Sequence, residues 1–163
     1  MLSSIPKTSV PLVGALQAWA NATPYLGEGV DIGIIDTGID YTHRNFGGAG
    51  TGAAYQANSP QVVEPLTFPT AKVVGGYDFV GNAYDARGLS GSSTPAPDPD
   101  PLDCNGHGSH VAGTAAGLGI LNAGSANPAA GDYGGYTALS SGNFSALFKI
   151  GPGVAPLANL YAL

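Results

Sequence analysis

Short apolar segments alternate with a helical segment along the 163 residues of the chain. The run at 30–35 is apolar, rich in β-branched residues and stops abruptly at Asp36, as a buried strand does. Further strands are predicted at 72–80 and 159–163. Between them, the small residues at 107–118 predict a helix that packs closely. This alternation predicts an α/β fold in which helices cover a parallel sheet.

The other segments predict one helix and two loops. In 12–20, Leu12, Leu16 and Trp19 recur at helical spacing. Every second residue of 94–101 is proline and two of the others are aspartate, which predicts a stiff, acidic, exposed and extended loop. Residues 119–151 are rich in glycine, alanine and serine and predict a long loop.

Charge and composition exclude several kinds of partner. The formal net charge is −6 and the five basic residues form no cluster, so we expect no nucleic-acid binding. No apolar run approaches the roughly 18–20 residues of a membrane helix, so we expect no membrane span. The low charge and high glycine content favour a secreted enzyme, although residues 1–6 lack the features of a signal peptide. Cys104 is the only cysteine, so no internal disulfide is possible.

Two polar residues, Asp36 and His107, lie at positions where functional side chains are expected. Asp36 follows a predicted strand directly, and open α/β sheets place their sites at the carboxyl ends of strands. His107 lies between glycines at the predicted start of a helix, where the helix dipole disfavours a protonated ring. Taken singly, each also fits an ordinary structural role: an Asp-x-Gly turn for Asp36 and a loop histidine for His107.

Together the two motifs resemble the subtilisin-like serine protease family. Asp-Thr-Gly after an apolar strand is followed later by His-Gly-Ser-His-Val-Ala-Gly-Thr, and the family has its aspartate, histidine and serine in that order. The similarity extends over 30–43 and 153–161. It implies a subtilisin-like three-layer fold and a serine endopeptidase that hydrolyses proteins or peptides.

The resemblance also implies roles for single residues. His107 would take the proton of a serine hydroxyl and return it to the leaving amine. Asp36 would accept a hydrogen bond from the other ring nitrogen. His110, one helical turn after His107, is expected to be structural. Asp40 and Asp103 are acidic neighbours of the site, and acids beside glycine-rich loops are usually solvated.

The family's serine motif, a Gly-Thr-Ser-Met-Ala-like stretch, does not occur in this sequence. We therefore expect residues 1–163 to be a truncated N-terminal portion of the catalytic domain, missing its C-terminal part and inactive alone. Long insertions are expected near 47–71 and 119–150. The resemblance to larger secreted and cell-wall-type members implies an extracellular or cell-wall-associated parent protein.

Three alternatives stay open at this stage. Members of the family often bind a structural calcium ion through an aspartate a few residues after the first motif. Here Asn45, a neutral and poorer ligand, occupies that position, which puts the calcium in doubt. Cys104, His107 and His110 have a spacing that could bind zinc. The chain could also be a non-catalytic remnant or a peptide-binding fragment.

Overall fold

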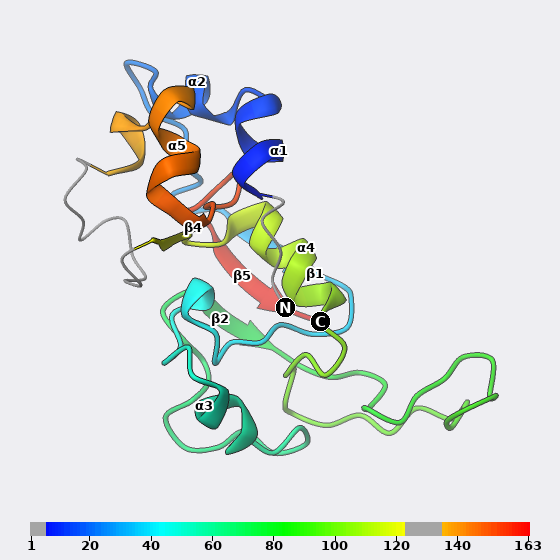
Figure 1. The fold of residues 1–163 in the computed structure, drawn as a ribbon. Helices are drawn as coiled ribbons and strands as arrows, with labels where there is room; N and C mark the ends of the chain where they lie inside the picture. The colour runs from blue at the N-terminus through cyan, green and yellow to red at the C-terminus, as the bar shows by residue number, and fades with distance from the viewer. Residues whose placement is uncertain (1–5, 123–134) are drawn as a thin grey trace.

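The computed structural model describes residues 6–122 and 135–163, arranged around a three-stranded parallel sheet (Figure 1). β5 (Asn159–Ala162) lies between β1 (Asp31–Ile34) and β2 (Val73–Gly76). The predicted α/β class and the parallel sheet are confirmed. All three strands are shorter than their predicted ranges.

Helix α4 (His107–Ala116) packs against β1 and β5. It begins at His107, as the sequence predicts. Ala112 and Ala116 are fully buried, and these small side chains let the helix backbone approach the sheet closely. The helix ends two residues earlier than predicted, because Gly117 is already extended with ψ at 145°.

A second apolar core surrounds Trp19. It is built by α1 (Pro6–Leu12), α2 (Ala15–Trp19), α5 (Ser141–Leu147) and β4 (Phe148–Ile150), which Figure 1 shows grouped beyond one end of β5. The indole Nε1 of Trp19 donates a hydrogen bond to the carbonyl of Val154, 2.9 Å away. This bond ties the second core to the segment that leads into β5. No helix of the described residues is long and apolar enough to cross a membrane.

The predicted helix at 12–20 is wrong in one respect, because two short helices replace it. Gly14 adopts a left-handed conformation with φ at 82°, which separates α1 from α2. Leu16 and Trp19 are buried as their spacing predicts, whereas the Leu12 side chain is 83% exposed. The break at Gly14 therefore removes Leu12 from the apolar face.

The predicted loop at 119–151 is also wrong, although part of it, 123–134, lies outside the described residues. The described part contains β3 (Ile120–Leu121), which pairs with β4 in an antiparallel ribbon, as well as η3 (Tyr136–Ala138) and α5. The segment is rich in glycine and serine, which favour a loop, but it also contains apolar residues that pack around Trp19. These are Tyr136, Leu139, Phe144 and Phe148.

The proline-rich segment 94–101 is exposed as predicted only in its first half. Asp98 exchanges two backbone hydrogen bonds with Asp78, of 2.9 and 3.1 Å, and Asp100 is only 1% exposed, with its carboxylate accepting a bond from the Tyr41 hydroxyl. The remaining short elements, η1 (Arg44–Phe46) and α3 (Gly52–Gln56), precede β2.

Lys72 is a buried cation that joins the start of β2 to the segment before β5. Its Nζ donates hydrogen bonds to the carbonyls of Pro156 and Ala158, and the side chain is 4% exposed. Burial lowers the pKa of Lys72 to about 8, from an ordinary value of 10.5. The unfolded chain therefore binds this proton more tightly than the folded chain does.

We expect stability to rise with pH because of Lys72. Between pH 7 and 9.5 the free energy of unfolding should increase by about 2 kcal/mol, since the native lysine loses its proton before the unfolded one does. Urea denaturation across this range measures the slope. Lys72→Met should abolish that part of the slope, and an unchanged slope in this variant would contradict the assignment.

Candidate active site

Asp36 lies just beyond the carboxyl end of β1. Its backbone N–H donates a 3.1 Å hydrogen bond to the carbonyl of Leu163, the residue that follows β5. The turn that carries Asp36 is thus fixed to the central strand. The Thr37 amide donates a 2.8 Å bond to Asp36 Oδ1, which orients the carboxylate.

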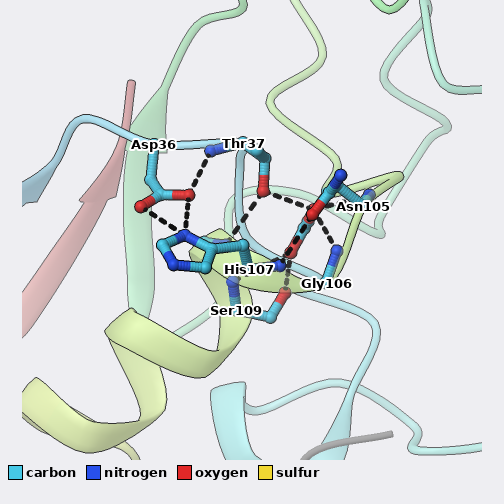
Figure 2. Close-up of polar contacts among 8 residues, drawn as sticks. Asp36, Thr37, Asn105, Gly106, His107 and Ser109 are labelled. Carbon is cyan, nitrogen blue, oxygen red and sulfur yellow. Dashed lines mark hydrogen bonds and ion pairs between the residues drawn. The ribbon is translucent and has the colours of Figure 1, made fainter.

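His107 is the first residue of α4 and faces Asp36 (Figure 2). Its Nδ1 lies 2.7 Å from Oδ1 and 2.8 Å from Oδ2 of that carboxylate. The His107 side chain is 66% exposed, and no hydrogen bond to its Nε2 is found within 6–122 and 135–163. The structure therefore brings the two predicted site residues together, with one ring nitrogen held and the other open. His107 opens a helix, so only Asp36 follows a strand directly.

The Asp36 carboxylate is held in its ionised form. Burial by itself would raise its pKa, but the hydrogen bonds from His107 and the Thr37 amide outweigh burial and hold the pKa below its ordinary value. An ionised carboxylate accepts a bond from Nδ1–H, so it favours the ring tautomer whose Nε2 is unprotonated. Such an Nε2 can accept a proton.

The first turn of α4 lies against the Asp36–Gly38 turn with no space between the backbones. The amide of Gly108 donates a 2.9 Å bond to Thr37 Oγ1. A Cβ atom on Gly108 would stand 2.1 Å from the carbonyl oxygen of Gly38. Only glycine permits this approach, which places His107 within reach of Asp36.

Asp103 has a role that the sequence did not reveal. The prediction of a solvated acid is wrong, because Asp103 is 3% exposed and its carboxylate accepts hydrogen bonds from around the site. An aspartate shortly before a helix is a recognised capping signal, and it could have pointed to this residue. Asp40 is partly exposed, and its carboxylate accepts bonds from the amide and hydroxyl of Thr42.

The zinc alternative finds no support in the geometry. Within the described residues, no group of three histidine, cysteine or acidic side chains could hold a metal ion. Cys104 is exposed, and the Nδ1 of His107 is engaged by Asp36. Asn45 is fully buried, and its side-chain oxygen accepts a 2.7 Å bond from the Gly119 amide, so this oxygen ties η1 to the segment between α4 and β3.

A cavity of about 440 Å³ opens beside Asp36. It lies at the carboxyl ends of the sheet strands, where α/β folds bind their ligands. Its walls combine polar groups of the site with partly exposed aromatic rings. The lining includes Asp36, Asn105, Tyr77, Tyr84, Leu102 and Leu163.

Comparison with known proteins decides the family. A family model described as the subtilase family matches residues 27–163. The chain belongs to the subtilase family. The match includes both Asp36 and His107, and the family resemblance predicted from the sequence is confirmed.

Individual subtilases are similar over shorter stretches. The minor extracellular protease Vpr of Bacillus subtilis is 35% identical over 117 residues, covering 69% of this chain and 10% of Vpr. A subtilisin-like protease of Arabidopsis thaliana is 39% identical over 109 residues, covering 61% of this chain and 13% of the plant protein. The chain therefore spans about a tenth of the length of the relatives it matches. No solved structure matches it.

Proposed function

We propose that Asp36 and His107 belong to the Asp/His/Ser triad of a serine endopeptidase, an enzyme that hydrolyses peptide bonds. In this triad His107 transfers the proton and Asp36 supports the His107 ring. The observation that carries the proposal is the contact of both Asp36 oxygens with His107 Nδ1, at 2.7 and 2.8 Å, beside an open Nε2. Membership of the subtilase family supports the same reaction.

In this reaction His107 Nε2 accepts the hydroxyl proton as a serine attacks the substrate carbonyl, and it later gives that proton to the leaving amine. Asp36 keeps the proton of the neutral ring on Nδ1. When the ring becomes an imidazolium, the same carboxylate stabilises its positive charge. The two side chains therefore act as one unit.

The serine nucleophile of the proposed triad lies outside these 163 residues, none of which form the family's serine motif. Cys104 is a poor substitute. Cys104 is exposed as a residue, but partial desolvation of its thiol and the nearby Asp103 carboxylate raise the pKa of Cys104, which disfavours the reactive thiolate. We accordingly propose that the chain alone is inactive and that residues 1–163 form the first part of a catalytic domain.

The substrates we propose are proteins or peptides. The cavity beside Asp36 offers polar groups and the rings of Tyr77 and Tyr84 to an extended chain. Because the name of the Bacillus subtilis relative describes an extracellular enzyme, we propose that the protein carrying this chain also acts outside the cell.

A serine-directed fluorophosphonate tests the placement of the nucleophile. We expect no labelling of the 163-residue chain, and we expect labelling of one serine in the longer protein that contains it. His107→Ala should slow the labelling of that longer protein, because the base that activates the serine is lost. Labelling of the short chain that disappears when one of its own serines is changed to alanine would contradict the proposal.

A further inference from the structure

We infer that Asp103 is the positioning residue that holds the His107 side chain in place against the Asp36 carboxylate. The inference rests on the proposed role of these two residues and adds a third that touches neither of them. It starts from a buried carboxylate that accepts five hydrogen bonds, all from the two segments that carry the pair.

The two carboxylate oxygens of Asp103 divide these donors between them. Oδ1 accepts from the amides of Asn105 and Gly106, both at 2.8 Å, and from the hydroxyl of Thr37 at 2.9 Å. Oδ2 accepts from the amide and hydroxyl of Ser109, at 2.8 and 2.6 Å. Asp103 therefore satisfies amides at the start of α4 that have no partner within the helix.

The two hydroxyls extend the network to the turn that carries Asp36. Thr37 Oγ1 accepts a bond from the Gly108 amide at 2.9 Å, and Ser109 Oγ accepts one from the Asp40 amide at 2.8 Å. Each hydroxyl receives an N–H, so its own proton is directed to Asp103. The helix and the turn are thus connected at two points, through Thr37 and through Asp40.

These connections flank the proposed catalytic pair. Thr37 is the neighbour of Asp36 in the chain, and Gly108 is the neighbour of His107. Figure 2 shows Thr37, Asn105, Gly106 and Ser109 gathered beside the pair. Loss of the Asp103 carboxylate would therefore allow the first turn of α4 to shift relative to Asp36, and the bond between Asp36 and His107 would weaken.

The chemistry of the site requires a carboxylate at this position. All five partners donate, and a carboxylate is a pure acceptor. In Asp103→Asn, an NH₂ group replaces one oxygen and meets an N–H or O–H donor in either orientation of the amide. The asparagine side chain is nearly the same size as that of aspartate, but its NH₂ group faces another hydrogen-bond donor. Both donors are then left without an acceptor.

Nuclear magnetic resonance of the 163-residue chain tests this inference without any hydrolysis. The readouts are the low-field signal of the His107 Nδ1 proton and the ring ¹⁵N shifts, which report the tautomer. Asp103→Asn should abolish the low-field signal and mix the two tautomers. Thr37→Val, which removes one hydroxyl, should speed exchange of that proton with water by about fivefold, in line with the loss of one hydrogen bond.

Matched variants separate positioning from general stability. Thr37→Ser and Ser109→Thr keep the hydroxyls and should retain the wild-type signal. Asp85→Asn is the control, because the Asp85 carboxylate also accepts bonds from three amides and a hydroxyl, all of them within its own loop at 85–90. It should leave the His107 signals unchanged.

If Asp103→Asn does not fold, the comparison of Thr37→Val with Thr37→Ser decides. Faster exchange in the valine variant, restored in the serine variant, supports the positioning role. Unchanged His107 signals in a folded Asp103→Asn or in Thr37→Val would overturn it. Since the readout is a hydrogen bond, loss of the proposed peptidase function would leave this result standing.

Discussion

Replacing His107 with alanine should lower kcat for peptide hydrolysis by about 10⁴-fold or more in the longer protein that we propose contains this chain. The ring accepts and returns the proton, and among the described residues the Asp36 carboxylate is otherwise hydrogen-bonded only by its neighbour Thr37, which cannot act as a base. KM should change little, because the lost interaction belongs to the transition state. Steady-state kinetics on a peptide substrate measures both constants.

His110→Gln is the matched control for this prediction. His110 lies one turn further along α4, and its Nε2 is buried without a partner among the described residues. We expect its kcat to stay within about tenfold of the wild type, since it makes no contact with Asp36. Comparable losses in the two variants would show that perturbing the helix, and not losing a base, explains the effect of His107→Ala.

Gly108→Ala is expected to damage both the fold and the site, although it adds a single methyl group. The new Cβ would stand 2.1 Å from the Gly38 carbonyl, and both groups belong to backbone that cannot rotate away. We expect the free energy of unfolding to fall by about 3 kcal/mol, as for an overpacked core. Denaturant unfolding measures this loss, and the low-field signal of the His107 ring proton should disappear with it.

Gly142→Ala provides the comparison. Gly142 is also the second residue of a helix, α5, but the nearest atom to its added Cβ would be 3.8 Å away. Alanine favours a helix over glycine by up to about 1 kcal/mol, so this variant should be as stable as the wild type or more so. Equal destabilisation by the two substitutions would contradict the close approach of α4 to the Asp36 turn.

The sequence predicted which two side chains meet at the candidate site, Asp36 and His107, better than it predicted the residues that support them. Asp36 stands at the end of an apolar run and His107 at the start of a helix, and the two motifs that contain them together point to the site. Asp103 lies shortly before a helix, which is a capping signal, but that local signal does not tell a buried acid from a solvated one. Its burial depends on α4 and the Asp36 turn meeting in space, and those segments are about 70 residues apart in the chain.

In the fold too, the elements set by their own residues were predicted, whereas the elements that depend on contacts distant in the sequence were not. The strand at β1 follows from an apolar, β-branched run, and the helix at α4 follows from the small residues of its own segment. The helix break at Gly14 depends on a single left-handed residue. The elements of 119–151 depend on Phe144 and Phe148 packing around Trp19, far away in the sequence, and composition alone could not indicate that contact.

A double-mutant cycle on kcat measures whether Asp36 and His107 act as one unit. It compares Asp36→Asn, His107→Ala and the double variant with the wild type in the longer protein that we propose contains this chain, with a peptide as the substrate. Because Asp36 acts only through the ring that it orients, the double variant should be as slow as His107→Ala alone. If instead the two losses multiply in the double variant, Asp36 and His107 work independently, and the proposed proton-transfer pair is wrong.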